Sequence, residues 1–243
     1  MVESYNSPTR RRKTAEVVAR RIVAYIAERQ LEPGAALPQE SEMQALLGVG
    51  RSTVREALRL LETQGVVALK TGRGPVLQRP TPEYLLNSLT LLLQFQGATF
   101  ESLLRARLMF EPAVVAEAAR VITGEEIDRL RQNLAGTDDE PEAFHQIVRR
   151  ELEFHHLIAK AAHNPFAETI VVALNAALSG EVFEVVTRHD TREDLRFHRS
   201  ITDALAAGDP DTASALMHEH LDDVLVMTTA THPDLLARPI HWM

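Results

Sequence analysis

The chain contains no cysteine among its 243 residues. This absence excludes disulfides, thiolate zinc sites and cysteine nucleophiles. No apolar run approaches the ~18 residues that suggest a membrane span. The basic start from Met1 to Lys13 has no apolar stretch behind it, so it is not a secretory signal. We therefore expect a cytoplasmic location and no membrane partner. Hydrophobic residues at 45% and charged residues at 25% are typical of a globular chain of one or two domains.

Charge is distributed unevenly along the chain. Residues 1–80 hold 13 Lys and Arg against 8 Asp and Glu, a net charge of +5. Residues 81–243 hold 13 Lys and Arg against 26 Asp and Glu, a net charge of −13, and all 10 His. A basic module joined to an acidic one indicates a polyanionic partner for the first module only.

Helical periodicity dominates the sequence. In the first 80 residues it predicts helices over 14–29, 38–47 and from Ser52 to the left-handed turn at Gly65, with Thr14 and Ser52 as caps. Strands at 66–69 and 75–77 would then form a hairpin. Residues 78–82, with two prolines, are the best linker candidate. From Glu83 to about Thr231 only helical patterns follow. We therefore predict a mostly α protein, with a winged helix-turn-helix and small β-hairpin before an all-α bundle.

The third predicted helix has the chemistry of a DNA-reading element. Its outward positions are Arg51, Ser52, Thr53, Arg55 and Arg59. Residues at the start of such a helix reach base edges in the major groove, where Arg pairs with guanine and Ser or Thr binds phosphate or base. Arg73 at the Gly72-Arg73-Gly74 hairpin tip could approach the backbone or minor groove.

A simpler interpretation exists for each arginine taken alone. Arg55 and Arg59 could merely solvate the helix and pair with Glu56 or Glu62. That interpretation weakens because basic residues gather together at the helix start, the hairpin tip and the arm from Arg10 to Lys13.

The first module resembles the GntR family of bacterial transcription regulators over about 60 residues. The resemblance rests on Leu31-Glu32-Pro33-Gly34, Leu37-Pro38, Glu40, Leu47-Gly48-Val49, Arg51, Val54-Arg55-Glu56-Ala57-Leu58, Leu61, Gly65-Val66-Val67 and Gly72-Arg73-Gly74. It implies that Arg51, Ser52, Thr53, Arg55 and the Gly72 wing contact DNA. This chain carries Gln39 and Ser41 where the family usually has Ser and a DNA-contacting Arg.

Histidines on apolar helix stripes predict a metal site in the second module. Glu151 and His155 are spaced i and i+4, while His198 and His220 lie on apolar stripes. His218 should face outward. Three neutral imidazoles and one carboxylate would suit zinc, nickel or manganese, and open positions could take a carboxylate ligand. The alternative is that each His is a satisfied core or rim residue, because periodicity cannot show that three helices converge.

The second module resembles the FCD effector domain of the FadR-type GntR subgroup. The resemblance rests on Arg107-Leu108-Met109-Phe110-Glu111-Pro112, Glu151-Leu152-Glu153-Phe154-His155, Ala161-Ala162-His163-Asn164-Pro165, His198-Arg199-Ser200-Ile201 and Met217-His218-Glu219-His220-Leu221. It implies that His155, His198 and His220 are metal ligands, with Glu151 where Asp is usual. It also implies that Arg107 reaches the effector pocket; the alternative is a buried ion pair with Glu111.

Together these features predict a DNA-binding regulator, more specifically a repressor. We expect a homodimer on a palindromic double-stranded operator, with release controlled by a small carboxylate at the metal. The alternatives are a regulator that senses the metal alone and a metal-dependent hydrolase, which lacks an obvious general base. The expected divisions are a flexible arm at 1–13, the DNA-binding domain at 14–77, a linker at 78–84, the effector and dimerisation domain at 85–231, and a tail at 232–243.

Overall fold

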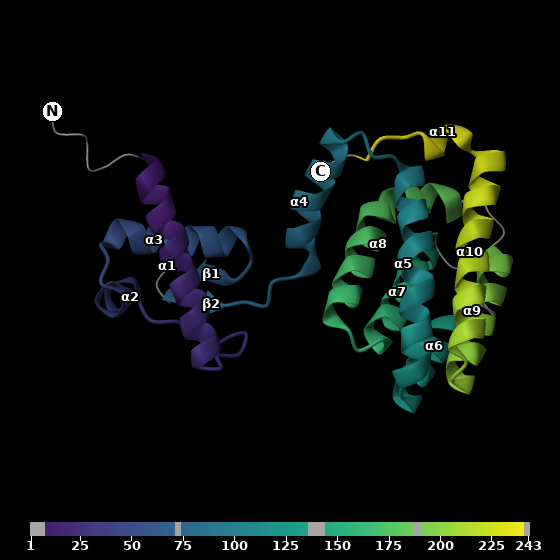
Figure 1. Ribbon diagram of the computed structural model, residues 1–243, viewed down its shortest axis with the longest axis horizontal. Coiled ribbons are helices and arrows are strands. Elements are labelled where there is room, and N and C mark those ends of the chain that lie inside the picture. The colour runs from purple at the N-terminus through teal and green to yellow at the C-terminus, as the bar shows by residue number, and fades with distance from the viewer. Residues whose placement is uncertain (1–7, 71–73, 136–143, 187–190, 241–243) are drawn as a thin grey trace. The chain divides into compact units, whose positions relative to one another are not determined.

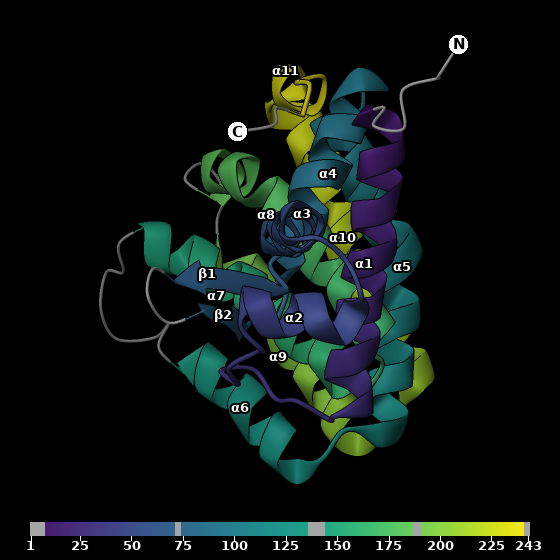
Figure 2. The same cartoon turned by 90° about the vertical axis from the view of Figure 1, so that its left-hand side faces the viewer.

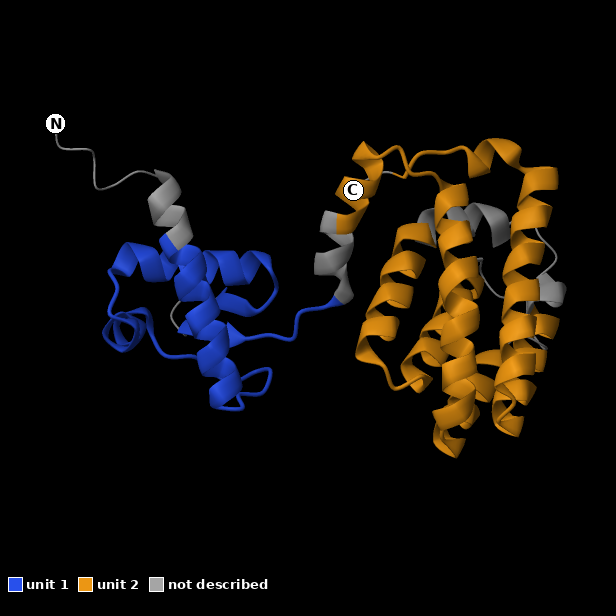
Figure 3. Cartoon of the chain, in the orientation of Figure 1, with its two compact units in different colours: residues 1–84 blue, residues 85–243 orange. Residues whose placement is uncertain are grey.

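A computed structural model divides the chain into two compact units, residues 1–84 and 85–243 (Figure 3). The structure describes residues 8–70, 74–135, 144–186 and 191–240, in some stretches as backbone alone. We call the first unit the head and the second the helical unit, and each is described by itself.

The head is a winged helix-turn-helix, as predicted. It contains α1 (Pro8–Glu28), α2 (Glu40–Leu47), α3 (Arg51–Thr63), β1 (Val67–Lys70) and β2 (Gly74–Leu77) (Figures 1 and 2). The two strands pair antiparallel, with Val67 opposite Leu77 and Lys70 opposite Gly74. Helix α3 packs against α1, α2 and β1. This packing leaves the remaining face of α3 exposed.

Apolar residues at helical spacing build the core of the head. The buried set comprises Val18, Ala19 and Ile22 of α1, Met43 and Leu47 of α2, Val54, Ala57, Leu58 and Leu61 of α3, with Leu37 and Val67. Because the four α3 residues recur at three- and four-residue intervals, they bury one stripe of that helix and direct its polar residues outward.

Left-handed glycines follow both α2 and α3. Gly48 ends α2 in the left-handed conformation (φ +67°), and Gly65 follows α3 with φ +69°. The N-cap of α3 is Gly50, whose carbonyl accepts from the amides of Thr53 and Val54. The prediction that Ser52 caps this helix was therefore wrong. Gly50 has an extended backbone (φ −69°, ψ 156°), and the helix begins at Arg51, one residue before Ser52.

The basic arm is partly helical. Helix α1 begins at Pro8, ahead of the expected cap at Thr14. Proline is compatible with the first turn of a helix, and arginine and lysine are good helix formers. Residues 8–13 are therefore a helical extension of α1 and not a loose tail.

The helical unit contains no strands within its described residues. Its helices are α4 (Pro82–Phe95), α5 (Phe100–Val121), α6 (Gly124–Ala135), α7 (Phe144–Ala161), α8 (Pro165–Val186), α9 (Thr191–Ala207), α10 (Pro210–Thr231) and the short α11 (Pro233–Leu236). Helix α4 begins inside the segment expected as a linker. Helix α5 is central, because it contacts α7, α8, α9 and α10 (Figure 1).

The segment after α10 is packed rather than loose, contrary to the expected tail at 232–243. Leu235, Leu236 and Ile240 are buried in a cluster with residues of α5, α7, α8 and α10. The Phe100 amide donates to the Arg238 carbonyl at 3.0 Å, and the Ile240 amide donates to the Ala98 carbonyl at 3.0 Å. Burial of these three large apolar side chains and the two hydrogen bonds to the start of α5 oppose the entropy cost of ordering this segment.

Among the described helices, none combines the length and apolar character that crossing a lipid bilayer requires.

Candidate functional site

The exposed face of α3 presents the predicted DNA-contacting residues. Arg51, Ser52, Arg55 and Arg59 are exposed, and Thr53 is half-buried. They lie opposite the stripe of Val54, Ala57, Leu58 and Leu61 that faces the core. The free amides of the first turn add to the positive character of this end of the helix.

Arg51 and Arg55 pair with a residue of α2 and not with their own helix. The Arg51 Nε donates to Glu40 Oε2 at 3.3 Å, and the Arg55 Nε lies 3.7 Å from Glu40 Oε1. Glu62 instead accepts from the Leu69 amide at 3.1 Å and ties α3 to β1. The simpler interpretation, in which Arg55 pairs with Glu56 or Glu62, therefore named the wrong partner, because the carboxylate that Arg55 meets comes from Glu40 of α2.

The first residue of β2 lies close to Gln39, one of the two residues that depart from the family pattern. A Cβ added to Gly74, which has φ +74°, would lie 2.6 Å from the Gln39 side chain. Gln39 is thus in close contact with the start of β2. Ser41 is exposed on the first turn of α2. Gly72 and Arg73 at the predicted wing tip lie outside the described residues.

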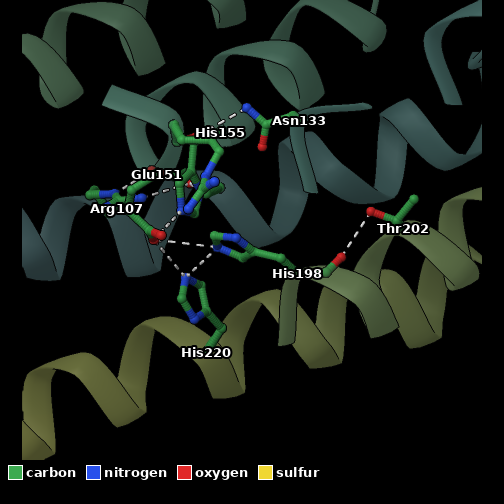
Figure 4. Close-up of polar contacts among 9 residues, drawn as sticks. Arg107, Asn133, Glu151, His155, His198, Thr202 and His220 are labelled. Carbon is green, nitrogen blue, oxygen red and sulfur yellow. Dashed lines mark hydrogen bonds and ion pairs between the residues drawn. The ribbon is translucent and has the colours of Figure 1, made fainter. Parts of the chain in front are cut away.

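The four predicted metal ligands converge in the helical unit (Figure 4). Glu151 and His155 come from α7, His198 from α9 and His220 from α10. One ligand atom from each lies within 4.8 Å of the other three. The imidazoles are buried, with exposures of 1%, 2% and 1%, and the Glu151 side chain is 17% exposed. His218 is exposed, as its spacing predicted.

The distances between these ligand atoms fit a single metal ion. Glu151 Oε1 lies 3.3 Å from His198 Nε2 and 3.7 Å from the Nε2 atoms of His155 and His220. The two Nε2 atoms of His198 and His220 are 3.3 Å apart. A tetrahedral ion with nitrogen ligands at about 2.0–2.1 Å would place its ligand atoms about 3.3 Å apart. The donor set of three imidazoles and one carboxylate therefore fits a transition metal in both chemistry and spacing.

Glu111 of α5 orients the cluster and was missed as a site residue. Its Oε2 lies 2.6 Å from His155 Nδ1, which leaves Nε2 directed at the other ligands. Its Oε1 accepts from Arg107 Nε at 2.5 Å. A carboxylate behind a ligating histidine fixes the ring and raises its basicity. The spacing of Arg107 and Glu111 suggested their ion pair, but it could not reveal His155 as a third partner.

The charges at Glu151, His198 and His220 favour metal ligation. Burial opposes ionisation of Glu151, but the three histidines outweigh burial and hold its pKa well below the ordinary range. Burial lowers the pKa of His198, and it lowers the pKa of His220 well below its usual value. Burial and Arg107 oppose protonation of His155, but Glu111 and Glu151 outweigh them and raise its pKa. An ionised carboxylate and neutral imidazoles are the forms that bind metal, so a metal ion at this site would have to displace the proton that the raised pKa of His155 favours.

A small cavity adjoins the cluster on one side. It measures about 20 Å³ and is lined by Asn133 and Leu134 of α6, Ile147, Arg150 and Glu151 of α7, and Leu195 and His198 of α9. The Asn133 amide nitrogen donates to the Arg150 carbonyl at 3.3 Å and so links α6 to α7. Asn133 carried no sequence signal, because only the packing of α6 on α7 and α9 brings it here.

Comparison with known proteins supplies the family. Residues 14–76 match the model "Bacterial regulatory proteins, gntR family", and residues 102–223 match the FCD domain. The chain is 32% identical over 233 residues to the "HTH-type transcriptional repressor NanR" of Cronobacter sakazakii, covering 89% of this chain and 86% of that protein. It is 31% identical over 226 residues to the repressor of the same name from Escherichia coli, covering 89% and 85%.

A solved structure agrees with these sequence matches. The Streptococcus agalactiae GntR structure superposes with a TM-score of 0.68 at 27% identity, covering 86% of this chain and 98% of that one. The family and its relatives are transcription regulators that bind DNA operators and are not enzymes, so the hydrolase alternative is set aside. The chain belongs to the GntR family of bacterial transcription regulators, in the FadR-type subgroup that carries an FCD domain.

Proposed function

We propose that this regulator represses transcription as a homodimer on a palindromic operator and is released by a small organic acid bound at a metal centre. The observation that carries the proposal is the convergence of Glu151, His155, His198 and His220 beside the buried Arg107 and Glu111 pair. Repression follows the relatives, which are named as repressors.

In the head, the proposed DNA contacts are Arg51, Ser52, Thr53, Arg55 and Arg59 of α3, together with Gly72 and Arg73 of the wing. The exposed start of α3 supports base reading in the major groove. Each bidentate contact from an arginine to guanine contributes roughly 1–3 kcal/mol of discrimination. Phosphate contacts add affinity that falls steeply with salt.

In the helical unit, the proposed metal ligands are Glu151, His155, His198 and His220. The ion would be zinc, nickel or manganese, which this donor set accommodates. An ion that takes more than four ligands would supply further coordination positions for a carboxylate, whereas a four-coordinate ion would not. Glu111 holds His155 in place, and Arg107 provides the cation proposed to bind the effector.

The small cavity suggests how the effector would act. Its volume of about 20 Å³ is close to the space that one water needs. A carboxylate entering there would have to displace side chains of α6, α7 or α9, so its binding would favour a different packing of these helices. A ligand shifts an equilibrium only by its differential affinity for the two states. A difference of about 1–3 kcal/mol would change operator affinity about 5–150-fold.

Dimerisation is proposed through the helical unit. Several large apolar residues of its described part are exposed: among them, Phe95 of α4 is 85% exposed, and Met109 and Phe110 of α5 are 77% and 49% exposed. Exposed apolar groups of this kind are typical of protein interaction surfaces. A symmetric pair would present two heads to the two halves of a palindrome.

The proposal is tested by elemental analysis and native mass spectrometry of the purified protein. We expect about one transition-metal ion per chain and the mass of a dimer, with any retained small acid visible as added mass. A metal-free monomer that nevertheless binds operator DNA would contradict the proposed sensor.

One observation favours the alternative of a regulator that senses the metal itself. Arg107 is 4% exposed and already paired with Glu111, so its cation is engaged within the protein. Operator release by the metal alone, measured by fluorescence anisotropy without any organic acid, would support this alternative. Release only after small carboxylates are added to the metal-loaded protein would support the proposed effector.

A further inference from the structure

A single carboxylate in the head holds two of the proposed DNA-reading cations. Glu40, at the first position of α2, places one oxygen 3.3 Å from Arg51 Nε and the other 3.7 Å from Arg55 Nε. The two arginines lie one helical turn apart on α3, and their side chains are 72% and 52% exposed. The pairing therefore lies on the face of α3 that is proposed to meet DNA.

Stabilisation of α2 does not account for where this carboxylate points. An acidic residue in the first turn favours a helix through the dipole, but Glu42 already performs the capping role, accepting from the Gln39 amide at 2.7 Å. The Glu40 backbone is held within α2, since its carbonyl accepts from Gln44 Nε2 at 3.2 Å. Its side chain turns away from its own helix end and across to α3.

We propose that Glu40 is a selectivity residue of the DNA interface, which restrains Arg51 and Arg55 from binding phosphate non-specifically. This inference rests on the proposed DNA contacts of α3. The carboxylate contacts each arginine at Nε, so a phosphate that approaches either guanidinium must displace the Glu40 carboxylate or lie close to its negative charge. Phosphates occur at every position of every duplex. Guanine edges offer a bidentate partner only at matching sequences. The Glu40 carboxylate repels an anionic phosphate more than an uncharged guanine edge. It therefore weakens binding to random DNA more than binding to the operator.

The test compares Glu40→Gln with the unaltered full chain on a 24-bp duplex of random sequence. Fluorescence anisotropy is measured between low and moderate salt. The variant is expected to bind this duplex roughly two- to fivefold more tightly for each released pair. One additional phosphate contact would steepen the logarithmic salt slope by about 0.9. Selection from a random duplex library should yield a less sharply defined consensus with the variant than with the unaltered protein.

Glu56→Gln is the matched charge control. Glu56 is exposed beside Arg55 on α3 and carries the same charge, but within the described part of the head no ion pair joins it to Arg51 or Arg55. Equal effects of the two substitutions would overturn the proposal, because they would show a dependence on charge alone.

A coupling test excludes a purely structural role for Glu40. In a chain that carries Arg51→Ala and Arg55→Ala, the further change Glu40→Gln should increase random-duplex affinity no more than Glu56→Gln does. An undiminished effect in that background would overturn the proposal, since Glu40 would then not act through Arg51 and Arg55. Failure of the unaltered protein to bind any duplex would instead overturn the proposed DNA contacts themselves.

Discussion

Arg51, Ser52 and Arg55 lie exposed on one helix of the head, whereas His155, His198 and His220 lie buried on three helices of the helical unit. Adjacent exposed residues on one helix form a surface through local geometry alone. Buried residues from separate helices form a site only if the whole unit packs correctly. Substitutions in the head should therefore change binding without changing the fold, and substitutions in the cluster should change both.

The two regions also handle charge differently. The arginines of α3 are partly balanced by Glu40 in contact with solvent, where ion pairs are weak and exchangeable. Arg107 and Glu111 are balanced at exposures of 4% and 3%, where loss of one partner leaves a buried charge. The exposed pairs of the head suit an interface where DNA must bind and dissociate. The buried pair of the helical unit holds Arg107 and Glu111 in fixed positions.

The largest expected effect is the loss of the metal from His198→Ala. Removal of one of four converging ligands should lower the metal content from about one ion per chain to near zero after dialysis, measured by elemental analysis. His218→Ala is the matched control, because this exposed imidazole lies on α10 away from the cluster. Unchanged metal content in His198→Ala would contradict the proposed site.

Glu111→Gln should have the next largest effect. It leaves the buried Arg107 without its countercharge and removes the carboxylate behind His155. We expect a loss of about 3–5 kcal/mol in the free energy of unfolding of the metal-free protein, measured by urea denaturation. Glu117→Gln is the control, because its pair with Arg120 on the same helix is about half exposed. Similar small losses of unfolding free energy in both variants would show that the buried pair of Arg107 and Glu111 contributes no more to stability than an exposed pair.

Arg55→Ala should weaken operator binding by about 1–3 kcal/mol, or roughly 5–150-fold, if Arg55 reads a base. The thermal unfolding midpoint should be nearly unchanged, since the side chain is exposed. The operator used is the duplex that the unaltered protein selects from a random library, and affinity is measured by anisotropy. Equal weakening on random and selected DNA would assign Arg55 to phosphate contact instead of base reading.

The smallest effect is expected at Asn175 of α8. Its side chain is buried, and neither its amide nitrogen nor its oxygen makes a hydrogen bond with any residue that the structure describes. Asn175→Leu should therefore raise the free energy of unfolding by roughly 1 kcal/mol, because it removes an unsatisfied buried amide. Urea denaturation measures the change. A decrease of similar size would indicate that the larger apolar group does not fit the space.

Sequence reasoning succeeded where the pattern is local. The α3 stripe from Val54 to Leu61, the turns at Gly48 and Gly65 and the hairpin after them all follow from residue type and spacing. Its errors at helix ends have physical causes. Gly50, and not Ser52, is the N-cap of α3. Helix α1 extends through the basic residues before Thr14 and begins at Pro8.

Sequence reasoning could not predict contacts between distant segments. Glu40 and Arg51 are separated by a turn between α2 and α3, and their pairing depends on the angle of that turn. The packed segment from Leu235 to Ile240 was misjudged as a tail, because its burial depends on residues of α5 and α8 far away in the chain.

The sequence by itself determined the family and the two-part organisation. It also determined the exposed cationic helix and the identity of the four candidate ligands, because each of these features depends on local residue spacing or on a motif. Only the tertiary structure decided that Glu151, His155, His198 and His220 meet around one point and that Glu111 stands behind His155. Three helices must pack at one relative position for these atoms to approach, and periodicity along each helix contains no information about that position.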